Sequence, residues 1–410
     1  MKEYSLIQLD NGIRILLHYQ NSTITHSCMI VNAGSRYEDP GNFGVAHFIE
    51  HLLFKRTTRR STNQILNRLE EVGGDLNAYT TKEYTCIHAS FLKPHLERAL
   101  DLFEDVLFHS TFPENEMEKE KSVILDEIAS YLDSPEESIM DDFEDLLFKD
   151  SGLGHNILGL EDDLNKMNRE AINKFMLQNY NTNEIIVAIA GDYTEAQVKR
   201  LADKIFAGIP ANNTAKVPQN VAWNGGFDTV VEKPINQAHY MIGAQTFGIY
   251  DDQKTAMLLL NNMLGGIGMS SILNLGIREK YGIAYTIESN LTLYSDTGSF
   301  SIYLGTDEEK LKKAISLVHK ELNKLKETPF SETQLRKAKE KFKGQIALAE
   351  ENRMSMIIAE AKNIIDYGRI MSLQDVFNKI DTIQVKELSD LSNRFLDPKN
   401  LLSLAFVPED

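Results

Sequence analysis

Residues 44–54 read GVAHFIEHLLF, and the rest of the chain can be interpreted outward from them. The stretch is apolar nearly all round, contains no proline and carries one polar cluster, which predicts a buried helix. His47 and His51 are one turn apart on such a helix, so both imidazoles leave the same face and can reach one metal ion. Glu50 lies close enough to contact a water molecule on that ion without being a ligand. The stretch therefore predicts a metal site with a neighbouring carboxylate.

The polar cluster has a structural alternative, in which the histidines are core residues that bond to backbone carbonyls. A single histidine in such a helix would favour this alternative. Two histidines and a glutamate are costly to bury unless something satisfies them, and zinc would do so. The order His-x-x-Glu-His is also the reverse of the commoner His-Glu-x-x-His motif of zinc enzymes. We therefore interpret the triplet as a zinc site.

The composition limits the class of protein. A chain of 410 residues suits two to three domains, and 42% apolar with 25% charged residues is typical of a soluble globular protein. The formal net charge of −17 is a poor match for nucleic acid. Cys28 and Cys86 lie in apolar strand-like runs, so we expect buried thiols in a reducing compartment. With no signal-peptide pattern and no segment long enough to span a bilayer, we expect a cytoplasmic protein without membrane association.

The strand and helix signals occur twice along the chain. Residues 5–9 and 13–19 flank an Asn-Gly turn, which predicts a hairpin, and Gly73 with Gly74 ends a helix after the metal motif. The same order of strands, helices and glycines begins again after residues 207–226, which lack periodicity. We therefore predict an α+β fold of two similar domains related by internal duplication, each a mixed, largely antiparallel sheet with helices packed on it. The predicted parts are a metal-bearing domain over 1–210, a linker over 211–226 and a homologous domain over 227–410.

A catalytic zinc ion takes three protein ligands and keeps a fourth position for water, so two histidines require one more ligand. The best source is the acidic helix predicted after Pro113, where Glu127 borders an apolar stripe that includes Val123. Glu120 lies two turns earlier on the same side of that helix. The alternative is that Glu120, Asp126 and Glu127 form an ordinary solvated face. The pattern alone does not decide between these two interpretations.

Four segments of the chain match one known family. They are GVAHFIEHLLFK at 44–55, GGDLNAYT at 73–80, Glu120 with VILDEI at 123–128, and LGG at 264–266 through Leu275, Arg278, Glu279 and GIAY at 282–285. With these segments the chain resembles the pitrilysin family of zinc peptidases, which includes insulin-degrading enzyme, mitochondrial processing peptidase and small two-domain bacterial relatives. The resemblance extends over nearly the whole chain.

The resemblance implies roles that spacing alone leaves open. Glu127 would be the third ligand of one zinc ion per chain, and Glu120 would support the site from outside the ligand set. Glu50 would be the general base. Asn77 and Ala78 would lie on an edge strand along which the substrate extends, although by pattern alone they are only a strand after a turn.

By the same resemblance, Arg278 and Tyr285 would form a pair that grips the substrate backbone. By pattern alone they are an exposed arginine and a half-buried strand tyrosine. The family builds a closed chamber from four α+β units and this chain has two, so the resemblance implies that two chains close on each other. A homodimer would be self-sufficient, and a heterodimer with a metal-free homologue is the alternative.

The resulting hypothesis is a zinc metalloendopeptidase that hydrolyses small unfolded peptides inside a closed chamber. A zinc-activated water would attack the peptide bond, and Glu50 would accept the proton of that water. One alternative is the zinc-bearing subunit of a heterodimeric processing peptidase. Another is a non-catalytic scaffold of the same fold, although such relatives have usually lost parts of the metal motif.

Overall fold

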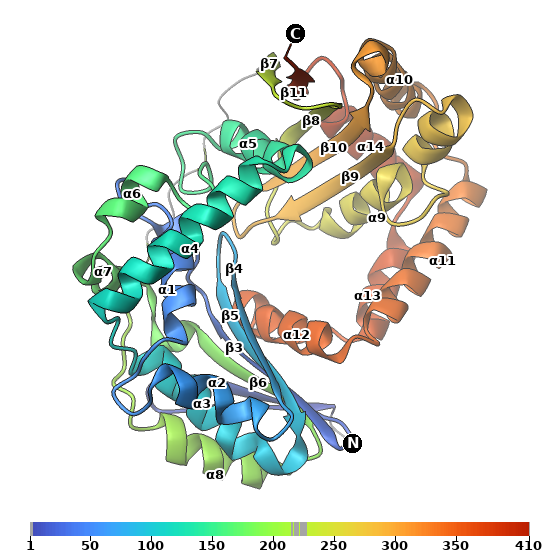
Figure 1. The fold of residues 1–410 in the computed structure, drawn as a ribbon. Coiled ribbons are helices and arrows are strands. Elements are labelled where there is room, and N and C mark those ends of the chain that lie inside the picture. Colours follow the sequence, from blue (N-terminus) through green and yellow to red (C-terminus); the bar gives the residue numbers. More distant parts are fainter. Residues whose placement is uncertain (1–2, 215, 217–220, 222–227, 410) are drawn as a thin grey trace. The chain divides into compact units, whose positions relative to one another are not determined.

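The computed structural model describes residues 3–214, 216, 221 and 228–409, and the chain divides into two compact units. Each unit is built around one β-sheet (Figure 1). Among the described residues, no helix is both long enough and apolar enough to cross a bilayer. Unit 1 comprises Met1–Ile128, His155–Gln219 and Ala349–Ile370, and unit 2 comprises Ala129–Gly154, Asn220–Leu348 and Met371–Asp410.

Unit 1 contains a six-stranded sheet with the order β1-β2-β6-β3-β5-β4. The predicted hairpin is the antiparallel β1–β2 pair, in which Gln8 pairs with Arg14. Gly12 in the turn has a φ of +97°, which glycine adopts at little cost. The strands are β1 (Tyr4–Gln8), β2 (Arg14–Tyr19), β3 (Ile24–Val31), β4 (Asp75–Thr80), β5 (Thr85–Leu92) and β6 (Ile185–Gly191).

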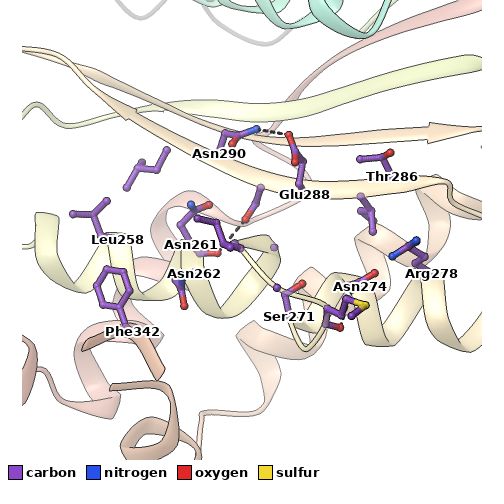
Figure 2. A pocket seen from close by; sticks show the side chains of 18 of the residues that line it. Leu258, Asn261, Asn262, Ser271, Asn274, Arg278, Thr286, Glu288, Asn290 and Phe342 are labelled. Carbon is purple, nitrogen blue, oxygen red and sulfur yellow. Dashed lines mark hydrogen bonds between the residues drawn. The ribbon is translucent and has the colours of Figure 1, made fainter. Parts of the chain in front are cut away.

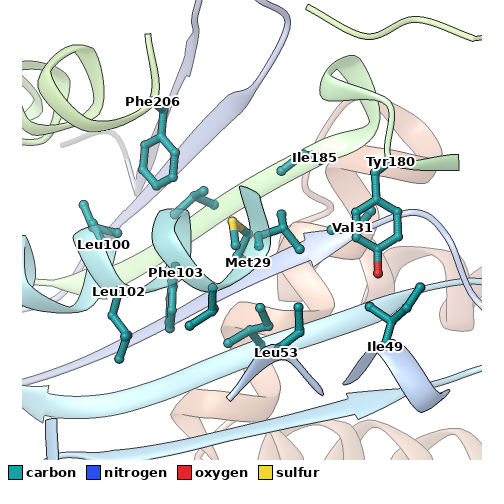
Figure 3. Close-up of a cluster of buried hydrophobic side chains, with 14 of the residues drawn as sticks. Met29, Val31, Ile49, Leu53, Leu100, Leu102, Phe103, Tyr180, Ile185 and Phe206 are labelled. Atoms are coloured by element: carbon teal, nitrogen blue, oxygen red, sulfur yellow. The ribbon is translucent and has the colours of Figure 1, made fainter. Parts of the chain in front are cut away.

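The helices of unit 1 bury their apolar faces on this sheet. On one face, Met29 and Val31 of the sheet pack with Leu100, Phe103 and Phe206 from two helices (Figure 3). Short 3-10 turns cover Ser35–Tyr37, Lys93–His95 and Thr182–Glu184. The helices are α1 (Val45–Leu53), α2 (Thr62–Glu70), α3 (Leu96–Phe108), α4 (Glu114–Leu132, which continues into unit 2), α6 (Glu161–Lys166), α7 (Arg169–Asn179), α8 (Glu195–Phe206) and α12 (Arg353–Tyr367).

Unit 2 contains a five-stranded sheet with the order β7-β11-β8-β10-β9. The strands are β7 (Asp228–Lys233), β8 (Ala238–Thr246), β9 (Thr286–Leu293), β10 (Gly298–Thr306) and β11 (Leu402–Pro408). The helices are α5 (Pro135–Leu147), α9 (Lys254–Gly265), a π-helical segment (Asn274–Glu279), α10 (Glu308–Glu327), α11 (Glu332–Ala349, which ends in unit 1), α13 (Leu373–Thr382) and α14 (Val385–Phe395). One core packs the sheet against α9, α10 and α14, and a second core packs it against α5.

The two sheets repeat one topology, which confirms the predicted internal duplication. Without β1, the first sheet reads β2-β6-β3-β5-β4, and the second reads β7-β11-β8-β10-β9. Both sheets contain one parallel pair among the described strands, β2 with β6 and β7 with β11, while the other neighbours are antiparallel. Each sheet is therefore mixed and largely antiparallel, as predicted.

Each unit includes one helix from the other half of the chain. In unit 2, Ile139 and Phe143 of α5 pack with Leu404 of β11. In unit 1, Ile357 of α12 packs with Leu16 of β2. The same layer under α12 contains both cysteines, which are buried free thiols, as predicted.

The predicted domains, 1–210 and 227–410, are continuous halves of the chain. They therefore assign α5 and α12 to the half in which each lies and not to the unit in which it packs. An apolar stripe predicts that a helix has a buried face, but it does not identify the sheet that covers that face. Of the predicted linker, residues 215, 217–220 and 222–226 lie outside the described residues. Lys216 is described: its Nζ lies 2.5 Å from Glu184 Oε2 and 4.6 Å from the centre of a tyrosine ring in unit 1.

Candidate metal centre

The N-terminus of α1 is held by a carboxylate from an earlier loop. Glu38 is buried, and its oxygens accept hydrogen bonds from the backbone N–H groups of Gly44 (2.7 Å) and Ala46 (2.8 Å). His155 Nε2 lies 2.9 Å from the same carboxylate. Gly44 has a φ of +94°, and a Cβ there would lie 2.7 Å from the carbonyl oxygen of Leu158, so glycine is required. These contacts satisfy N–H groups that a helix start leaves without intrahelical partners.

The predicted zinc ligands converge on one point in unit 1. Glu127 Oε2 on α4 lies 3.8 Å from His47 Nε2 and 3.5 Å from His51 Nε2 on α1. The three ligand atoms lie within 4.8 Å of one another, and the two imidazole rings are 4.6 Å apart at 73°. These distances are too long for good hydrogen bonds. Ligands about 2.0–2.1 Å from a tetrahedral zinc ion lie roughly 3.3–3.5 Å apart, so the separations of 3.5 and 3.8 Å from Glu127 are close to those that zinc requires.

The protonation of His47 also suits a metal ligand. Burial, with a smaller contribution from His51, lowers the pKa of His47 to about 3. The imidazole is therefore neutral at pH 7, which is the form that binds metal ions. Its Nδ1 is buried and has no hydrogen-bond partner among the described residues. Glu127 is the open side of the site, because its side chain is 44% exposed.

Glu120 lies behind one histidine, outside the group of three converging side chains. Its Oε2 is 3.2 Å from His51 Nδ1, and its Oε1 is 2.6 Å from Lys55 Nζ. A hydrogen bond donated by Nδ1 to this carboxylate would leave Nε2 available to a metal ion. On the same helix Ile124 is buried, but Val123, which the sequence placed in the apolar stripe, is 48% exposed. The prediction for Val123 was wrong, because the buried face of the helix is narrower than the run of apolar residues in the sequence.

Glu50 lies beside the three converging side chains without joining them. The Thr80 hydroxyl donates a hydrogen bond of 2.7 Å to Glu50 Oε2. Burial raises the pKa of the Glu50 carboxyl, and the bond from Thr80 opposes that shift. The general-base role of Glu50 stays a prediction, and a carboxylate held in this way is available for it. This contact of Thr80 could not be predicted from the sequence, because no local pattern links a strand end to a helix residue 30 positions away.

Asn77 and Ala78 lie on β4, which is an edge strand of the first sheet. They pair with His88 and Ile87 of β5. The other edge of β4 has no strand partner in the described sheet, so its backbone groups on that side can pair with an added strand.

Arg278 and Tyr285 lie in unit 2 and line one pocket with a volume of about 570 Å³. Figure 2 shows this pocket with Arg278 in its wall. Arg278 belongs to the π-helical segment Asn274–Glu279, and such segments are frequent at functional sites. The Tyr285 hydroxyl donates to Asp307 Oδ1 at 2.6 Å. Glu288 of β9 adds a carboxylate to the pocket wall. The predicted pair therefore shares one pocket, and its contact with substrate stays a prediction.

Glu38 was not predicted from the sequence. A glutamate seven positions before the first residue of a helix is not a recognised capping pattern, so nothing local distinguished it from other loop carboxylates. His155, which lies against Glu38, is buried and stacks on Phe43 with ring centres 4.1 Å apart.

Comparisons with known proteins agree with this geometry. Residues 14–161 match the family described as Insulinase (Peptidase family M16), and residues 166–342 match the Peptidase M16 inactive domain. The uncharacterized zinc protease YmxG of Bacillus subtilis is 31% identical over 397 residues, which cover 96% of each protein. An uncharacterized zinc protease of Rickettsia bellii is 30% identical over 398 residues, which cover 96% of this chain and 95% of the relative.

Two solved structures have the same fold. A protease from Helicobacter pylori superimposes with a TM-score of 0.89 at 21% identity, over 99% of each chain. A peptidase M16 inactive domain protein from Pseudomonas fluorescens gives a TM-score of 0.90 at 20% identity, over 99% of this chain and 98% of that one.

Proposed function

Because the chain belongs to the insulinase family, peptidase family M16, we propose that it is a zinc-dependent endopeptidase that hydrolyses small unfolded peptides. The observation that carries the proposal is the convergence of His47, His51 and Glu127 at distances that suit zinc. Family membership, and relatives named as zinc proteases, support a zinc protease in general terms. The roles of single residues and the kind of peptide belong to the proposal.

In this proposal the residues of the candidate site have separate tasks. His47, His51 and Glu127 would hold one zinc ion per chain, which when bound would polarise a water molecule and lower its pKa to about 7. Glu50 accepts a proton from the attacking water and delivers it to the nitrogen of the leaving amine. Thr80 keeps Glu50 Oε2 in place, so the carboxylate does not have to reorient. General acid–base catalysis of this kind contributes roughly 10²–10⁴-fold.

The edge strand β4 suggests how a substrate is held. An extended peptide can add to the free edge of β4 near Asn77 and Ala78 through backbone hydrogen bonds, which demand little of its sequence. Only an unfolded segment can present a backbone in this way, which is why we propose unfolded peptides. Arg278 and Tyr285 would contact the peptide backbone from their shared pocket.

We extend the proposal to a cytoplasmic homodimer that forms a closed chamber. The alternative assembly pairs this zinc-bearing chain with a metal-free homologue, and light scattering with a cleavage assay on the pure chain separates the two. A pure dimer that cleaves peptides supports the homodimer. A pure chain that is inactive until a homologue is added contradicts it. The scaffold alternative is less favoured because the whole ligand set is present.

A peptide-library digest tests the proposed activity. We expect the zinc-loaded chain to cleave peptides of many sequences, to lose this activity with a chelator and to regain it with added zinc. The zinc content of each sample is measured in parallel. Cleavage that persists after the metal has been removed would contradict the proposal, as would a fully zinc-loaded chain that cleaves nothing.

A further inference from the structure

The internal duplication gives elements of unit 2 their counterparts in unit 1. By strand order and chain order, β7, β11 and α10 correspond to β2, β6 and α3. In unit 1, α8 follows β6 and packs against α3 and β2. It buries Val198, Ala202 and Phe206, which are spaced four residues apart, in the main core. Helix α8 therefore covers the part of the first sheet at β2, next to α3.

The corresponding place in unit 2 is a cavity of about 740 Å³ between α10 and the strands β7, β8 and β11. We name this cavity the β7–α10 groove, and its elements lie together in Figure 1. Among the described residues, α10 is the only helix that lines it. Apolar side chains from all four elements form its walls, namely Val230, Ile242, Leu311, Ile315, Ala405 and Val407.

The exposure of β7 differs sharply from that of its counterpart. Val230 is 65% exposed, whereas Ile15 and Leu17 on β2 are 1% and 0% exposed. The groove thus presents to solvent an apolar surface that α8 helps to bury in unit 1. Apolar concave surfaces of this size commonly mark binding sites.

The charges at the groove indicate the kind of occupant. In unit 1, Lys204 of α8 pairs with Glu97 in the first turn of α3 at 2.6 Å. The first turn of α10 carries Glu308 and Glu309, and both are exposed and line the groove. Asp228 at the start of β7 adds a third carboxylate. An occupant with basic residues would therefore meet the same kind of partner that α8 meets in unit 1.

Two basic residues, Lys312 and His319, also line the groove, so its rim is not purely acidic. Three carboxylates still exceed the one permanent cation. We propose that the β7–α10 groove is the docking site of an amphipathic helix from a partner protein. This helix presents apolar residues at i, i+4 and i+8 and Lys or Arg on its flank, as α8 does. The inference goes beyond the proposed peptidase activity, because the predicted zinc ligands all lie in unit 1.

A synthetic peptide of residues 194–208, TEAQVKRLADKIFAG, serves as the probe because it reproduces α8. Binding to the full chain is measured by calorimetry, and peptide helicity is measured by circular dichroism. We expect saturable binding and a gain of helicity, since so short a helix is only marginally stable alone. The control peptide carries Val198→Asp and Phe206→Asp and should bind at least about tenfold more weakly.

Variants of the chain assign the binding to the groove. Val230→Asp should weaken peptide binding by about tenfold or more, whereas Leu177→Asp, at a residue on α7 that is 70% exposed, should leave it unchanged. The double variant Glu308→Lys and Glu309→Lys should also weaken binding, and high salt should reduce that difference. Circular dichroism confirms that each variant is folded.

Three outcomes would overturn the proposal. The first is no saturable binding of the α8 peptide. The second is an affinity that Val230→Asp leaves unchanged, because the peptide would then be displacing α8 in unit 1. The third is binding of small apolar dyes to the groove without binding of the peptide, which would assign the groove to small ligands.

Discussion

At the scale of single residues, Glu50 and Glu127 differ in what their oxygens face. Glu127 Oε2 faces the Nε2 atoms of His47 and His51 at 3.8 and 3.5 Å. Glu50 Oε2 accepts a hydrogen bond from Thr80 instead. This difference agrees with the proposed roles, in which Glu127 is a zinc ligand and Glu50 is the proton acceptor.

Replacing Glu50 with glutamine separates these roles. Glu50→Gln keeps the size of the side chain but removes the proton acceptor, so we expect bound zinc to stay at one per chain. We expect kcat to fall by roughly 10²–10⁴-fold. His51→Ala, as the comparison, should lose both zinc and turnover. Zinc analysis and steady-state cleavage measure the two effects, and a Glu50→Gln protein with normal kcat would remove Glu50 from the mechanism.

The sequence identified some site residues and left others open for a physical reason. His47 and His51 could be predicted because their relation depends on the period of one helix. Glu127 could not be separated from Glu120 and Asp126 without the resemblance. Helical period shows which residues share a face, but not which of them meets a neighbouring helix.

At the scale of elements, the start of helix α1, which carries His47 and His51, is stabilised by residues outside the helix. Glu38 holds two N–H groups at its start, and His155 lies against the same carboxylate. Helix α2, in contrast, starts with a local capping box between Ser61 and Gln64. The second kind of cap is readable from sequence, because its partners are three residues apart. The first kind requires the tertiary fold.

These two caps should differ in their contribution to stability. Glu38→Ala leaves two N–H groups at a buried helix start without an acceptor, so we expect a loss of about 2–4 kcal/mol in the free energy of unfolding. Ser61→Ala removes an exposed cap and should cost about 1 kcal/mol. Urea denaturation of both variants measures the difference. Equal losses would show that Glu38 is not an important anchor of α1.

At the scale of the whole molecule, the chain exchanges a helix between its two halves. Helix α12 docks on the sheet of unit 1, where Arg14 donates to the carbonyl of Ile364 at 2.9 Å. His18 Nδ1 lies 3.0 Å from Glu360 Oε1 of the same helix. The duplication could be predicted, because turn and helix-stop signals repeat along the chain. The exchange could not, because either sheet can cover an apolar helix face.

The contact between His18 and α12 should make the docking depend on pH. The hydrogen bond to Glu360 raises the pKa of His18. A raised pKa means that the protonated form stabilises the fold, fully below the unfolded value of about 6.5, and that this stabilisation is lost as the pH rises through the folded value. We expect part of the protection of α12 against hydrogen exchange, corrected for intrinsic rates, to be lost as the pH rises through the folded pKa of His18. His18→Gln should abolish this loss, and an unchanged pH dependence in that variant would exclude the pair as its source.

The most direct test of the zinc site is a crystal structure of the zinc-loaded chain with anomalous data at the zinc edge. We predict one peak per chain, about 2.0–2.2 Å from His47 Nε2, His51 Nε2 and a Glu127 oxygen. An anomalous peak held by other residues, or a zinc ion at the two histidines with Glu127 turned away, would contradict the account.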